Sequence, residues 1–147
     1  MDLLKHVALL RFSFQRQTGR ELLRTIVAPE SAVLQLQQAP FAVVSHGMEA
    51  DPIFNYANQT ALGLFEMEWE EFIRLPSRLS AEAMERNERE RLLQRVTEHG
   101  FVDDYSGIRI SSCGRRFLVK DATVWNLVDE NGLYQGQAAL LKHWQFL

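Results

Sequence analysis

Beyond Gly100 the chain changes to a two-residue period, and this pattern limits the fold more than any other feature. Residues 101–112, 115–130 and 133–147 alternate apolar and polar side chains, which is typical of half-buried strands. Only the turns SCGR and DENG separate them, and short turns join antiparallel neighbours. We therefore expect three consecutive antiparallel strands. In the middle strand the alternation predicts one shared face for Phe117, Val119, Asp121, Thr123 and Trp125.

The segment before these strands predicts two more strands and a group of helices. Residues 41–47 and 52–58 are short apolar runs with a turn between them, as expected of strands. Residues 58–67, 68–75 and 80–100 have helical spacing of their apolar side chains. The order predicts an α+β fold with a five-stranded antiparallel sheet and helices on one face.

Residues at the helix ends support these assignments. Asn58 precedes its helix at the N-cap position, and Gly100 follows the long helix where a C-cap is expected. Asn87 with Glu90 three positions later resembles a capping box.

Residues 1–38 predict a helical extension ahead of the main domain, residues 39–147. Leu3, Val7, Leu10 and Phe14 form the apolar stripe of an amphipathic helix over residues 2–17. Two short helices are expected at 19–27, ended by Pro29, and at 31–39, capped by Ser31 and ended by Pro40. The stripe needs a partner, either the sheet or the same helix of a second copy. We predict a homodimer interface there.

Composition limits the compartment and the partners. The chain has 147 residues, 46% of them hydrophobic and 24% charged, enough for one folded domain. With a net charge of -3, the chain has no overall positive charge that would attract a phosphate backbone. We therefore expect no nucleic-acid partner. The one cysteine, Cys113, excludes an internal disulfide and favours a reducing cytoplasm. The charged N-terminal segment predicts no signal peptide and no membrane span.

Residues 45–67, SHGMEADPIFNYANQTALGLFEM, gather polar side chains that suggest an active site. His46, Glu49 and Asp51 are metal-ligand types, but their spacing fits a turn over 46–52 better. Ser45 and His46 would point to opposite faces of a strand, which separates a nucleophile from its base. We predict no catalytic residue and no metal site.

The order of elements is that of the PAS fold, and residues 53–78, IFNYANQTALGLFEMEWEEFIRLPSR, resemble the PAS core pattern. At family level the chain resembles the MEKHLA domain, a PAS-related family. Four blocks carry the resemblance: residues 39–82, 105–117, 122–132 and 136–144. Without the hexapeptide that names the family, a homeodomain or leucine heptads, the chain is nearer the single-domain bacterial and cyanobacterial members than the plant class III homeodomain-leucine zipper proteins.

The resemblance implies a ligand pocket between the inner sheet face and the helices. The expected lining residues are Phe41 or Val43, Phe54, Asn55, Leu64, Phe65, Phe72, Phe117 and Trp125. The polar candidates are His46, Tyr105 and Arg109. An ordinary filled core would use the same aromatic side chains, and that alternative stays open.

Cofactors are not predicted to be obligatory. Cys113 lies in a turn, outside the helical region where flavin-binding PAS domains carry their reactive cysteine. His99 ends the long helix, where some PAS proteins place a haem ligand, but a helix C-terminal cation also explains it.

We expect a non-enzymatic sensory or protein-interaction module that binds a small molecule and forms a homodimer. Its ligand and any protein partner stay unidentified. Two alternatives are a small hydrolase-type or isomerase-type enzyme that uses His46 in a cavity under the sheet, and a haem or flavin sensor.

Overall fold

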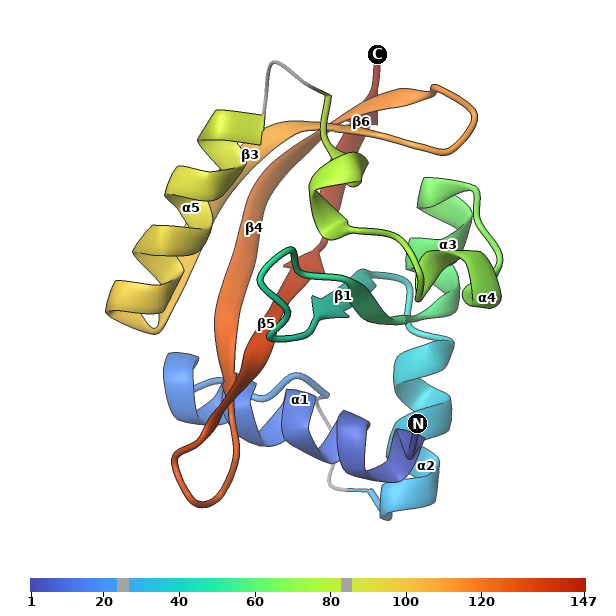
Figure 1. The fold of residues 1–147 in the computed structure, drawn as a ribbon. Helices are drawn as coiled ribbons and strands as arrows, with labels where there is room; N and C mark the ends of the chain where they lie inside the picture. The colour runs from blue at the N-terminus through green and yellow to red at the C-terminus, as the bar shows by residue number, and fades with distance from the viewer. Residues whose placement is uncertain (24–26, 83–85) are drawn as a thin grey trace.

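The computed structural model describes residues 1–23, 27–82 and 86–147. In this part of the chain one antiparallel sheet has six strands (Figure 1). They are β1 (Ala42–His46), β2 (Phe54–Ala57), β3 (Phe101–Ile110), β4 (Arg116–Val128), β5 (Tyr134–Leu141) and β6 (His143–Phe146). The order is β2-β1-β5-β4-β3, with β6 paired to β4. The predicted α+β class and antiparallel sheet are confirmed.

The last predicted strand, 133–147, is broken at Lys142. Its first part, β5, pairs with residues 123–128 of β4, and its second part, β6, pairs with residues 117–120. The sheet therefore has one strand more than the five predicted.

A bulge in β4 overturns the predicted alternation. Asp121 has a left-handed φ of 53°, and its backbone N–H donates to the Ser106 hydroxyl at 3.2 Å. Such an extra residue shifts the register of all later side chains. Phe117 and Val119 consequently point to one face, whereas Trp125 points to the other.

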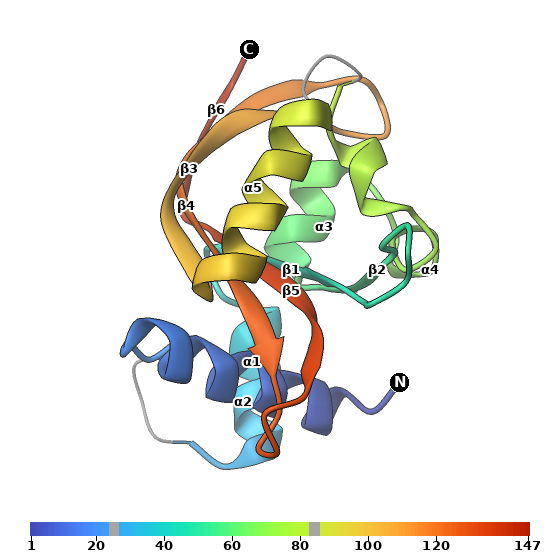
Figure 2. The same ribbon diagram turned by 60° about the vertical axis from the view of Figure 1, so that its left-hand side comes forward.

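The inner face of the sheet is covered by the helices that follow β2. These are α3 (Gln59–Phe65), α4 (Trp69–Phe72), the 3-10 turn η1 (Ser77–Ser80) and α5 (Arg86–His99). Val44, Phe117 and Leu141 pack there with Phe65 and Phe72. Helices α3, α4 and α5 lie on one side of the twisted sheet, as predicted (Figure 2).

The outer face is covered by α1 (Leu3–Thr18) and α2 (Pro29–Gln37). Helix α1 lies across one end of β4 and β5 (Figure 1). Val7, Leu10 and Phe14 are fully buried there, and the Phe14 ring meets the Trp125 ring edge-on at 4.9 Å between centres. The predicted stripe therefore packs on this chain's own sheet, and it is not available as a dimer interface.

Of the two short helices predicted near the N-terminus, the second is present as α2 but begins at Pro29, and the first is not seen in its described residues. Residues 19–23 form bends, and residues 24–26 of the predicted 19–27 helix lie outside the described part. Helix α2 begins at Pro29 with Ala28 as its N-cap, so Ser31 does not cap it. Proline suits the first position of a helix because its missing N–H would have no partner there.

The predicted cap at Asn58 is confirmed, and the residue does more than cap. Its Oδ1 accepts from the backbone N–H groups of Ala61 and Val43, each at 3.1 Å. Its Nδ2 donates to the carbonyls of Leu36 and Phe41. Asn58 thus ties α2, β1 and α3 together.

Of the two caps predicted for α5, the C-terminal one is confirmed and the N-terminal one is wrong. Gly100 takes the C-cap conformation, with φ +92° and its N–H on the Val96 carbonyl at 2.8 Å. Asn87 lies within α5, so it is not the N-cap; residues 83–85 of the predicted helix lie outside the described part.

Candidate ligand cavity

A cavity of about 60 Å³ lies between the inner sheet face, η1 and α5. One water molecule needs about 10–15 Å³ of such space, so the cavity has room for about four to six non-hydrogen atoms. Its apolar walls are Val44, Phe54, Phe65, Leu92, Leu93, Val124, Ala138, Ala139 and Leu141. Its polar residues are Ser45, His46, Ser77, Ser80, Arg89, Tyr105, Arg109 and Gln137.

His46 ends β1 with its imidazole in the cavity wall, and only 7% of the residue is exposed. Its Nδ1 lies 3.0 Å from the Gly47 carbonyl, and since a carbonyl only accepts, Nδ1 carries the proton. Burial is the main cause that lowers the pKa of His46; the hydrogen bond to the Gly47 carbonyl opposes it, and the positive charge of Arg89 lowers the pKa further. The ring is neutral near pH 7, which leaves Nε2 as a lone-pair acceptor.

The Nε2 atom of His46 is buried without a hydrogen-bond partner among the residues described. The side chain of Gln137 is near enough to raise the pKa of His46 slightly, yet no bond within hydrogen-bond geometry joins them. Buried polar atoms are normally paired, so Nε2 is an open acceptor on the cavity wall.

Gly136 on β5 is required where β5 passes the end of β1. It has φ +129°, and a Cβ there would collide with the His46 carbonyl oxygen. This close approach of the two strands fixes the backbone that carries the imidazole.

Arg89 lies on α5 with 6% of its surface exposed. Its Nη2 donates to the Ser77 hydroxyl of η1. Burial lowers the pKa of the guanidinium to about 10, and the nearby positive charge of Arg109 acts in the same direction. Arg89 is nevertheless protonated at pH 7, so the cavity contains a buried cation.

Tyr105 and Arg109 form the β3 side of the cavity. The Arg109 guanidinium carbon lies 5.2 Å from the centre of the Tyr105 ring, a cation-π geometry. Both residues are half-buried.

A second polar group lies on the outer side of β1. The Ser45 hydroxyl donates to Asn55 Oδ1 at 2.5 Å, and His6 Nε2 lies 2.8 Å from the same hydroxyl. Because the hydroxyl proton is directed to Asn55, His6 is the donor to Ser45. The pair therefore lacks the proton arrangement of a nucleophile with its base.

The structure brings together five of the predicted pocket residues: Phe54, Phe65, His46, Tyr105 and Arg109. Leu64, Phe72 and Phe117 fill the adjoining core, with Phe54 stacked on Phe72 at 4.2 Å. The other four predicted residues do not line the cavity. Phe41, Val43 and Trp125 pack with the outer cluster, and Asn55 bonds to Ser45. Val43 and Trp125 alternate with inward neighbours on their strands, which explains their position.

Sequence analysis missed Arg89, Ser77 and Gln137. A signal for Arg89 was present, because Leu92, Leu93 and Val96 follow it at spacings of three, four and seven on the buried face of α5. The predicted turn over 46–52 was also wrong at its first residue, since His46 belongs to β1 and is buried.

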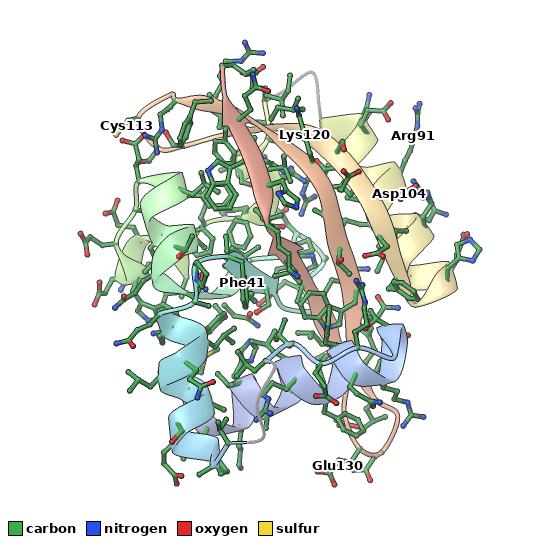
Figure 3. All side chains as sticks on the ribbon, turned by 180° about the vertical axis from the view of Figure 1, so that it is seen from behind. Phe41, Arg91, Asp104, Cys113, Lys120 and Glu130 are labelled. Atoms are coloured by element: carbon green, nitrogen blue, oxygen red, sulfur yellow. The ribbon has the colours of Figure 1, made fainter. Side chains whose placement is uncertain are left out.

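Cofactor chemistry does not fit this cavity. Room for about four to six non-hydrogen atoms is far below the size of a haem or a flavin. Cys113 is exposed at the tip of the β3–β4 hairpin (Figure 3), and neither it nor His99 lines the cavity. Among the described residues no three His, Cys, Asp or Glu side chains are grouped to hold a metal. No helix in that same part is long and apolar enough to cross a membrane.

The fold is the one seen in PAS and light-oxygen-voltage domains. A PAS domain from Colwellia psychrerythraea has a TM-score of 0.65 at 13% identity, covering 77% of this chain and 93% of that one. An RNA-binding light-oxygen-voltage receptor has a TM-score of 0.70 at 16% identity, covering 85% and 36%. The light-state dimer of the fungal photoreceptor Vivid has 0.61 at 12%, covering 90% of each. At these identities the likeness concerns the fold alone.

The chain belongs to the MEKHLA domain family, whose model matches residues 4–146. Homeobox-leucine zipper protein ATHB-9 of Arabidopsis thaliana is 29% identical over 101 residues, 67% of this chain. Homeobox-leucine zipper protein HOX32 of Oryza sativa subsp. japonica is 24% identical over 139 residues, 92% of this chain. The chain spans 12% and 16% of the lengths of these two proteins. The resemblance to the family is confirmed.

Proposed function

We propose that this domain is a non-enzymatic sensory module of the cytoplasm, regulated by a small molecule bound between the sheet and α5. One observation carries the proposal: the cavity has apolar walls and a few convergent polar groups, His46 and Arg89 among them. Binding sites typically combine such walls with a small number of orienting polar groups. The sensory fold of the class supports the same function.

Catalysis has less support than binding. His46 is the candidate base, and its one hydrogen bond among the described residues goes to the Gly47 carbonyl. A base needs a reacting group within hydrogen-bond reach, and the neighbouring Ser45 hydroxyl is bonded on the other face of β1. A bound substrate would have to supply every other reacting group.

A cavity-filling substitution tests the sensory proposal. Ala139→Phe fills the space from β5, and Ala50→Phe places the same ring on an exposed loop as a control. Native mass spectrometry of gently purified protein should show a small bound molecule on the wild type and on Ala50→Phe but not on Ala139→Phe. Circular dichroism checks that each variant is folded. An adduct retained by a folded Ala139→Phe protein contradicts the proposal.

We also propose that two chains associate through the outward row of α1. Leu4 and Phe12 are 42% and 38% exposed there, with Ala8 between them. The occupant would be the same row of a second copy, and the Vivid structure is a dimer of the same fold class. The inward stripe of Leu3, Val7, Leu10 and Phe14 contributes only by holding α1 in place.

Light scattering tests the dimer. Leu4→Glu combined with Phe12→Glu should convert a dimer mass to a monomer mass, because charges would be buried at the contact. Leu34→Glu, at an exposed site on α2, should leave the dimer intact. A wild-type monomer, or a dimer that survives the double substitution, would reject this interface.

A further inference from the structure

Two side chains in the cavity wall, Arg89 and His46, offer opposite hydrogen-bonding groups to a ligand. Arg89 presents a guanidinium with five N–H donors and no acceptor, and one hydrogen bond, to Ser77, engages it among the described residues. No carboxylate in that part of the chain forms an ion pair with it. His46 presents the opposite chemistry, a neutral ring whose Nε2 accepts one proton donor.

A ligand that satisfies both side chains and the apolar wall would have three parts. A buried guanidinium is best satisfied by a carboxylate, which accepts two parallel N–H bonds. The acceptor Nε2 in the same wall needs a proton donor, and a neutral hydroxyl suits it better than an ammonium group because the Arg89 cation lies in the same wall. The apolar part of the wall, which includes Phe65, Leu92 and Val124, suits the carbon atoms of the ligand.

Size limits the ligand further. With room for about four to six non-hydrogen atoms, the cavity admits glycolate, with five such atoms, or lactate, with six. Larger hydroxy acids and aromatic acids exceed this space.

We propose that the cavity binds a short 2-hydroxycarboxylate, with its carboxylate on Arg89 and its hydroxyl donating to Nε2 of His46. The inference rests on the proposed ligand-sensing function and adds the chemical class of the ligand. A plain carboxylate of the same length leaves Nε2 unpaired. A neutral diol leaves the guanidinium without its counter-charge.

Three probes separate these cases by calorimetric titration of the full chain: glycolate, acetate and ethylene glycol. Glycolate should bind about fivefold to tenfold more tightly than acetate, because one buried hydrogen bond is gained. Ethylene glycol should not bind measurably. Equal affinity for glycolate and acetate, or binding of ethylene glycol as tight as that of glycolate, overturns the proposal without any variant.

Matched substitutions assign the two roles. Arg89→Met should weaken glycolate and acetate alike, by more than about tenfold. His46→Phe should weaken glycolate to the level of acetate and leave acetate itself unchanged. Arg91→Met is the control on the same helix, since the Arg91 side chain is 73% exposed and points away from the domain (Figure 3). Wild-type affinity in a folded Arg89→Met protein would reject the assignment.

Failure of the ligand class and failure of the sensory proposal give different results. A bound molecule without a carboxylate in native mass spectrometry, displaced by Ala139→Phe, would reject the hydroxycarboxylate and retain the sensory function. Glycolate affinity that Ala139→Phe does not change would reject the cavity as the site in both proposals.

Discussion

A histidine side chain lies on each side of β1, and the two differ in their hydrogen bonds. On the outer side His6 donates to Ser45 and Ser45 donates to Asn55, so the polar groups satisfy one another. On the inner side Nε2 of His46 has no hydrogen-bond partner among the described residues, and it lies in a cavity wall that also contains Arg89. A closed set of partners stabilises a fold, whereas an open set is suited to a ligand. The group of His6, Ser45 and Asn55 is thus structural, and the inner side is the candidate site.

The largest expected change in stability comes from the packing of the outer side. Trp125 is fully buried on the outer side between the sheet and Phe14. Trp125→Ala should lower the free energy of unfolding by about 3–5 kcal/mol in urea titration, since the cavity it leaves cannot close. Trp144→Ala, at a half-buried site on β6, should cost clearly less. Equal losses would show that the outer core is not the tightly packed layer described.

The fold could be predicted further than the site. Alternation after Gly100, the cap at Asn58 and the family blocks predicted the antiparallel sheet and the inner helices, because these signals are local in sequence. The bulge at Asp121 has no comparable local signal, since an aspartate with positive φ is stabilised by a contact with Ser106 on another strand. That one residue moved Trp125 from the predicted pocket to the outer core.

The site depended on tertiary contacts between distant segments. Arg89 and His46 are separated by most of the helical region, and only the packing of α5 on the sheet brings them to one cavity. His6 could not be predicted from the sequence for the same reason, because its partner Ser45 is 39 positions away.

Low pH should destabilise the fold through His6, the histidine on the outer side of β1. Burial lowers the pKa of His6 to about 4 from the usual 6.5, so between these values the unfolded chain binds a proton that the folded chain does not. The stabilisation is complete above pH 6.5 and is lost as the pH falls toward 4, by up to about 3 kcal/mol. His46 acts in the same direction, since its pKa is also lowered.

Urea unfolding between pH 4 and pH 7 measures this loss. In His6→Gln the amide keeps a donor toward Ser45 but does not titrate, so stability should fall less steeply with acid than in the wild type. His143→Gln, exposed on β6, should keep the wild-type slope. An unchanged slope in His6→Gln would mean that His6 is protonated equally in the folded and unfolded chains.

The smallest expected change contrasts the two sides directly. Ser45→Ala leaves the His6 donor and the Asn55 acceptor without their partner, and it should cost about 1–3 kcal/mol of unfolding free energy. Arg89→Met removes a buried charge that no described carboxylate pairs, and methionine fills similar apolar space. Replacing such a charge by a hydrophobic side chain is often neutral or stabilising. Urea titration at pH 7 should therefore find Arg89→Met at least as stable as the wild type, because Arg89 costs folding free energy that ligand binding would recover. A loss as large as that of Ser45→Ala would instead make Arg89 a structural residue like those of the outer side.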